Sequence, residues 1–108
     1  MNRILKEKPY YVNARLGLYE IFMQKKMYKE CINELKQAID YQPDNFKCYF
    51  SLANTYVFMN QIENAIDSLE YAFKLASPEF HSTIKKNIEN AKEFDILKEN
   101  PRFQELLK

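Results

Sequence analysis

Three side chains in this sequence could supply the nitrogen or sulfur ligands of a zinc site: Cys31, Cys48 and His81. A structural zinc site needs about four nitrogen or sulfur ligands, which commonly come in closely spaced pairs. The three residues lie 17 and 33 positions apart, so they form no such pair. We therefore expect no metal site, and we interpret both cysteines as parts of helical patterns rather than of a disulfide framework.

The sequence also lacks a recognisable set of the residues that covalent catalysis requires. A nucleophile needs an adjacent base, a third group that orients the base, and donors for the developing oxyanion. His81 is followed by Ser82, but no third group is readable, so His81 is interpreted as a surface residue. Cys31 occupies a small core position of a helical pattern. A phosphate-binding loop requires several glycines, whereas Gly17 is the only glycine. We expect no catalytic residue, no cofactor and no enzyme activity.

The composition argues against further classes of function. Lys and Arg number 16 and Asp and Glu 15, which leaves a net charge of +1 and no broad positive field for nucleic acid. Carboxylates such as Glu63, Asp67 and Glu70 lie on the solvated side of a predicted helix. No apolar run approaches the ~18–20 residues that span a bilayer, and the first residues lack the apolar core of a secretory signal. We expect a cytoplasmic protein without a membrane or nucleic-acid partner.

A predicted helical hairpin at residues 46–75 organises the chain. Its apolar residues recur at the i, i+3, i+4 and i+7 spacing of a helix face on both sides of the Asn60-Gln61 turn. The small residues Ala53 and Ala65 lie in mid-stripe, where two antiparallel helices can approach closely. The two stripes are Tyr49, Leu52, Ala53 and Tyr56, then Ile62, Ala65, Ile66, Leu69, Ala72 and Phe73.

The same pattern recurs 34 residues earlier, which indicates a repeat. Ile66, Leu69 and Ala72 correspond to residues of the same size class, and Pro43 corresponds to Pro9. Each proline ends one helix just before the next begins. The second helix of the earlier hairpin supplies the matching positions: Tyr28, Cys31, Ile32, Leu35, Ala38 and Ile39.

These residues resemble the tetratricopeptide repeat family, whose 34-residue unit carries aromatic, Leu-small, Ala and closing Pro positions. The earlier unit departs from the pattern at Arg15, which replaces the first aromatic, and at Tyr19, where a small residue is usual. The resemblance implies an all-α fold, a right-handed superhelical stack of antiparallel helix hairpins. The later unit matches at Tyr49, Leu52, Ala53, Tyr56, Ala65, Leu69, Ala72 and Pro78, and the earlier one at Leu18, Phe22, Tyr28, Cys31, Ile32, Leu35, Ala38 and Pro43.

We expect one domain with five segments. Asp44 or Asn45 caps the second unit, and Ser77 with Pro78 opens a more polar helix that shields the last apolar face from water. A final short helix starts at Asn100-Pro101, and residues 97–107 resemble the LxxxPRFxxLL ending of many tetratricopeptide arrays. We interpret that ending as a hydrophobic latch, with Phe103, Leu106 and Leu107 against the cap. The segments are a partial preceding helix (1–8), two repeats (10–43 and 44–77), a capping helix (78–94) and the latch (95–108).

The resemblance implies a concave groove, lined by the first helix of each unit, that receives a peptide or a partner helix. Phe50, Val57 and Phe58 lie off the packing stripe and are expected to be exposed there; alternatively, the cap helix covers Phe50 and Val57. Glu20 and Leu16 replace the clamp residues with which some family members hold a terminal carboxylate. The expected groove residues are Asn13, Leu16, Glu20, Lys47, Phe50, Asn54, Val57 and Phe58, with Met23, Lys85 and Glu89 beside them.

The leading interpretation is a non-catalytic protein-interaction scaffold from a bacterial or similarly Lys/Asn-rich source. An alternative is self-association, a homodimer through an uncovered face of the N-terminal hairpin at Leu18, Tyr19 and Phe22. The chain could also be the C-terminal fragment of a longer array. A third class, an enzyme or a nucleic-acid binder, has the least support.

Overall fold

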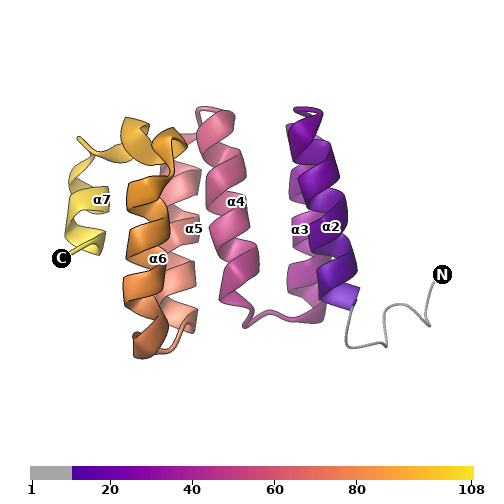
Figure 1. Ribbon diagram of the computed structural model, residues 1–108, viewed down its shortest axis with the longest axis horizontal. Helices are drawn as coiled ribbons and strands as arrows, with labels where there is room; N and C mark the ends of the chain where they lie inside the picture. Colours follow the sequence, from indigo (N-terminus) through magenta and orange to yellow (C-terminus); the bar gives the residue numbers. More distant parts are fainter. Residues whose placement is uncertain (1–10) are drawn as a thin grey trace.

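The computed structural model describes residues 11–108, and every element within that range is a helix. The helices stand side by side along the longest axis, and α2 and α6 lie in front of α3 and α5 (Figure 1). This confirms the all-α stack of helical hairpins; the partial helix expected at residues 1–8 lies outside the described range. The elements are α2 (Tyr11–Gln24), α3 (Tyr28–Tyr41), α4 (Phe46–Phe58), α5 (Ile62–Leu75), α6 (Pro78–Asn90), the 3-10 helix η1 (Lys92–Leu97) and α7 (Pro101–Leu106).

The two hairpin turns have the same backbone conformation, 34 residues apart. Lys26 and Asn60 both have φ of 60°, in the left-handed region. In the first turn, the Lys26 N–H donates to the Met23 carbonyl (3.0 Å) and the Met27 N–H to the Phe22 carbonyl (2.9 Å). These bonds form the Schellman motif that ends many helices. The second turn repeats them, with donors Asn60 and Gln61 and acceptors Val57 and Tyr56.

Helix α4 is buried on two sides. Leu52 packs in one cluster with Tyr19, Cys31 and Leu35 of the first hairpin. Ala53 and Val57 instead belong to the cluster of the second hairpin and the cap. The two hairpins are therefore held together through α4. The residues with no exposed surface include Cys31, Leu35, Ala38, Cys48, Ala53, Ala65, Ile66, Leu69 and Ala72.

Both departures from the repeat pattern are accommodated in the first hairpin. Arg15 Nη1 lies 2.6 Å from Glu34 Oε1, and Arg15 Nε donates to the Tyr11 hydroxyl at 3.1 Å. The hydrogen bond to Glu34 is the main reason why the pKa of Arg15 is raised. Tyr19 is only 6% exposed, because its ring packs among residues of α3 and α4. The expectation that Tyr19 lies on an uncovered face is therefore wrong.

The chain leaves the capping helix earlier than the sequence suggested. Helix α6 ends at Asn90, not at Phe94, because Ala91 adopts an extended conformation (φ −95°, ψ 110°). The following turn, η1, then directs Phe94 and Leu97 into the core, where they are 1% and 0% exposed. Phe94 reaches back to α4, with its ring 5.6 Å from that of Phe50.

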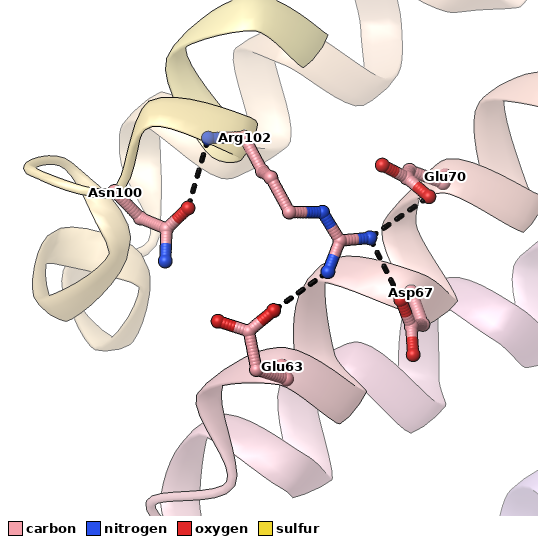
Figure 2. A network of polar contacts seen from close by, with 5 residues as sticks. All are labelled: Glu63, Asp67, Glu70, Asn100 and Arg102. Atoms are coloured by element: carbon pink, nitrogen blue, oxygen red, sulfur yellow. Dashed lines mark hydrogen bonds and ion pairs between the residues drawn. The ribbon is translucent and has the colours of Figure 1, made fainter.

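The C-terminal helix α7 is attached to α5 by apolar and ionic contacts. Helix α7 starts where the sequence suggested, and the Asn100 side chain caps it by accepting the Arg102 N–H at 2.9 Å. Phe103 is 2% exposed and belongs to the main core cluster, with Leu106 and Leu107 packed beside it. The Arg102 guanidinium faces three carboxylates on successive turns of α5 (Figure 2). The acceptors are Glu63 (2.6 Å), Asp67 (2.7 Å) and Glu70 (3.0 Å).

Replacement of Ala65 by arginine should unfold the chain. The residue is fully buried where α4 and α5 pack, and a buried charge without a partner costs about 3–5 kcal/mol, on top of the steric cost. Thermal denaturation followed by circular dichroism measures the effect. Asn64→Arg, at the exposed neighbouring position, should leave the melting temperature nearly unchanged. An unchanged melting temperature for Ala65→Arg would contradict the hairpin packing.

Replacement of Lys26 by glycine should raise the free energy of unfolding by about 0.5–1 kcal/mol. A lysine at positive φ is strained, and glycine removes that strain at some entropic cost in the unfolded chain. Asn60→Gly should gain less, because asparagine tolerates this conformation. Lys25→Gly, one position earlier, should lower stability. Urea denaturation compares the variants, and a loss of stability in Lys26→Gly would contradict the strain.

Replacement of Arg102 by glutamine should lower the melting temperature at low ionic strength. The variant leaves three carboxylates of α5 without their shared cation, so they repel one another. The loss should shrink in about 1 M salt, where charges are screened beyond ~3 Å. Lys98→Gln, which removes one exposed ion pair to Asp95, is the matched control. A loss that does not depend on salt would assign Arg102 a packing role instead.

Candidate partner-binding surface

A pocket of about 410 Å³ lies between α4 and α6. Its lining combines an apolar wall with polar groups that can form hydrogen bonds, and Lys47 is its only charged residue. These are the features of a site that takes a bulky apolar group and orients it by a few polar contacts. The lining residues are Phe46, Phe50, Phe80 and Ile84 on the apolar side, and Lys47, Ser51, Thr83 and Asn87 on the polar side.

Aromatic rings form the wall of this pocket. The Phe46 and Phe80 rings are 5.5 Å apart and tilted by 38°. Phe80 is 43% exposed, so a partner can reach its ring. Phe50 is half-buried, because the Phe94 ring of η1 packs against it. The pocket therefore has one accessible aromatic ring, that of Phe80, and a second ring, that of Phe50, against which the C-terminal segment packs.

The structure brings only two of the eight predicted groove residues into the pocket, Lys47 and Phe50. Val57 is 7% exposed and belongs to the core, so the expectation that it is exposed is wrong. The alternative, in which the cap covers Phe50 and Val57, is closer to the structure, although η1 supplies the ring against Phe50. Phe58 is 46% exposed as expected, but its ring stacks on Tyr28 of α3 at 5.9 Å.

The predicted residues at the α2–α4 junction do not line this pocket. Asn54 Nδ2 donates to the Tyr19 hydroxyl at 3.3 Å, which ties α4 to α2. The Asn54 Oδ1 atom is buried and has no hydrogen-bond partner among the described residues. Asn13 and Glu20 are exposed on α2, and Leu16 is half-buried. Of the residues expected beside the groove, Met23 is half-buried, Glu89 is exposed, and Lys85 Nζ lies 3.5 Å from the Lys108 carbonyl.

Phe46 and Phe80 line the pocket but were not among the predicted groove residues, although the repeat contained a signal for them. The two phenylalanines are 34 positions apart, as are Phe50 and Ile84. The two residues of each pair therefore occupy equivalent positions in the first helices of consecutive units. Neighbouring units face each other through such positions. The period alone could have placed the four apolar residues of the pocket together.

The side chains that could do chemistry have structural surroundings. Burial raises the pKa of the Cys48 thiol to about 11 and also raises that of Cys31, so neither is a thiolate near pH 7. The Nε2 atom of His81 lies 2.8 Å from the Phe73 carbonyl oxygen and 3.2 Å from the Ala76 carbonyl oxygen. In the tautomer that carries the proton on Nε2, this N–H can donate to both carbonyls. His81 is therefore not a plain surface residue: it caps the end of α5.

Two further features limit the chemistry of the described residues. Within residues 11–108, no three His, Cys, Asp or Glu side chains are grouped so as to hold a metal ion. A hollow beside α5 is lined by Asp67, Glu70, Tyr71 and Lys74, but both carboxylates pair with Arg102.

None of the helices described is both long enough and apolar enough to cross a bilayer.

Comparison with protein families identifies the repeat. A model described as TPR repeat matches residues 20–59, and a model described as tetratricopeptide repeat matches residues 46–78. Together they cover more than half of the 108 residues and include both hairpin turns. Comparisons with curated proteins and with solved structures returned no match. The two family matches and the stacked hairpins with their repeated turns show that this chain belongs to the tetratricopeptide repeat family.

Proposed function

We propose that this protein is a non-catalytic scaffold that binds a peptide or a partner helix on the face formed by the first helices of its repeats. Tetratricopeptide repeats generally mediate protein–protein interaction, and the family is typically non-catalytic. The pocket between α4 and α6 is the observation that carries the proposal for this chain. A cytoplasmic location and a bacterial source belong to the proposal too, and they rest on the sequence alone.

The pocket suits an apolar anchor residue of a partner. Phe80 offers an exposed ring face, and Phe46 and Ile84 supply the surrounding apolar surface. Aromatic anchors in such pockets commonly contribute most of the binding energy of an interface. The partner backbone can then bond to the polar lining, because Ser51, Thr83 and Asn87 each carry a hydrogen-bonding group.

The charge at the pocket favours an acidic group beside the anchor. Lys47 is exposed on the first turn of α4 and has no ion-pair partner among the described residues. An acidic side chain of the partner would gain a charged hydrogen bond there. We therefore expect bound peptides to combine a bulky apolar residue with a nearby Asp or Glu.

Replacement of Phe80 by alanine should weaken the binding of such peptides about tenfold or more, which corresponds to about 1.4 kcal/mol. Peptides selected from a random library against the full chain provide the probe, and calorimetry measures their affinity. Lys47→Glu should also weaken the binding of these peptides, and the loss of affinity should be largest at low salt.

Tyr71→Ala is the matched control. Tyr71 is 52% exposed on α5 and its ring lies 5.3 Å from that of Tyr49 of α4, a separation similar to that of Phe80 and Phe46, but it lies outside the pocket. Its replacement should leave the affinity unchanged. Equal losses in both variants, or selected peptides that ignore Phe80, would overturn the assignment of the pocket. Circular dichroism checks that both variants keep the wild-type melting temperature within a few degrees.

A further inference from the structure

The turn between α2 and α3 carries a cluster of exposed positive charge. Lys25, Lys26 and Lys29 are all exposed, and none of them forms an ion pair with a described residue. Their Cα atoms are at most about 15 Å apart, because only three residues separate the first lysine from the last. Glu30 is the only carboxylate in residues 24–30, so the segment keeps an excess of positive charge. A short anionic chain can therefore contact all three ammonium groups.

The repeat does not require this charge. The equivalent positions of the second turn, 34 residues later, are Met59, Asn60 and Glu63. Both turns nevertheless have the same backbone conformation and the same pattern of hydrogen bonds. The turn can thus form without a lysine at any of these positions, and the formation of the turn does not explain why three lysines are present.

Lys26 stands at a position that disfavours a lysine. Its φ of 60° lies in the left-handed region, which asparagine, the residue of the second turn, tolerates better. Backbone strain of this kind is found mainly at functional sites. No described residue offsets the strain through an ion pair with Lys26. A partner that pairs with its charge gives a physical reason for a lysine here.

Apolar side chains are exposed beside the three lysines. Met27, which lies between them in the chain, is 38% exposed. Tyr28 follows it and stacks on Phe58 of α4, with ring centroids 5.9 Å apart and an interplanar angle of 6°. Phe58 is still largely exposed, so part of its ring is open to a partner. We refer to five residues as the turn patch: Lys25, Lys26, Met27, Lys29 and Phe58.

The turn patch is separate from the pocket between α4 and α6. The α2–α3 and α4–α5 turns lie at one end of the helices, and α4 begins at the other end (Figure 1). Phe58 is the last residue of α4, whereas Phe46 and Lys47 of the pocket lie in its first turn. The two surfaces are therefore at opposite ends of α4, and binding at one does not require binding at the other.

We propose that the turn patch binds an acidic segment of a protein partner, in which Asp or Glu residues flank an apolar side chain. The carboxylates pair with the lysines, and the apolar side chain covers Met27 and the open part of the Phe58 ring. Membranes and nucleic acids present negative charge over a much longer distance than this turn. The chain has a net charge of +1 and offers no broad positive field to match them, whereas a short acidic segment matches the extent of the patch.

Nuclear magnetic resonance of the full chain, titrated with a synthetic peptide, tests the proposal. The peptide carries glutamates on both sides of one phenylalanine and one leucine, and its ends are blocked so that no terminal carboxylate contributes. Amide shifts should concentrate in residues 24–30 and 58–61, and the affinity should fall as salt is added. The same peptide with glutamine in place of glutamate should bind at least about threefold more weakly, because it loses several exposed ion pairs.

Lys26→Asn separates binding from folding. The variant gives the first turn the residue of the second, so the melting temperature should stay the same or rise, while the peptide binds about twofold to fivefold more weakly. Replacement of all three lysines by glutamine should weaken binding about tenfold or more. Lys36→Gln is the matched control, because it removes an exposed lysine from α3 outside the patch and should leave the affinity unchanged.

The outcomes distinguish this proposal from binding in the pocket. Phe80→Ala should leave the affinity for the peptide unchanged, and shifts confined to the surroundings of Lys47 and Thr83 would overturn the turn patch. An absence of shifts at millimolar peptide would contradict it, as would equal losses in Lys26→Asn and Lys36→Gln. Tighter binding to phosphatidylserine vesicles or to a DNA duplex than to the peptide would overturn the choice of an acidic protein segment.

Discussion

The burial of α4 on two sides is the constraint on which the rest of the structure depends. A hairpin of two amphipathic helices buries one apolar stripe per helix and leaves the outer surface to water. Helix α4 instead buries Leu52 against the first hairpin and Ala53 against the second. Neither hairpin forms a complete core alone, because the clusters share this helix. Small residues at the contact of α4 with α5, Ala53 and Ala65, are fully buried and let these two helices pack closely.

The two ends of the stack formed by the described residues differ. At the C-terminal end, α6 is followed by η1 and α7, which return over α4, α5 and α6 and bury Phe94, Leu97 and Phe103. The ion pairs of Arg102 also orient α7 on α5, because one guanidinium contacts carboxylates on successive turns of α5. At the other end, the described residues leave Leu18 and Ile21 of α2 in contact with solvent.

The pocket between α4 and α6 follows from the way the C-terminal end is built. Because α6 is a single helix and not the first half of a full hairpin, the C-terminal segment approaches α4 as a short turn. Its Phe94 ring supports Phe50, while Phe80 stays accessible across the pocket. The pocket thus arises from a modified repeat.

The local sequence determined the helical hairpins of this protein, their period and part of its core. The spacing of apolar residues predicted the hairpins and their period, since a helix places residues three and four apart on one face. The cap of α4 could be narrowed to Asp44 or Asn45, because a cap bonds to a backbone N–H only two or three residues away; the structure assigns it to Asn45. Cys31 and Ala65 were readable as core residues, because small residues in mid-stripe mark close helix contacts, and both are fully buried.

Only the tertiary structure decided which helix faces are covered and by what. Val57 lies off the main stripe of α4, yet it is buried, because the second cluster approaches from that side. Phe80 is exposed at the start of α6, whereas Phe94 is buried because the chain leaves the helix at Ala91. His81 became a helix cap through carbonyls five and eight residues away. Periodicity fixes where apolar surface lies on a helix, but burial depends on the position of other elements, which a one-dimensional pattern does not contain.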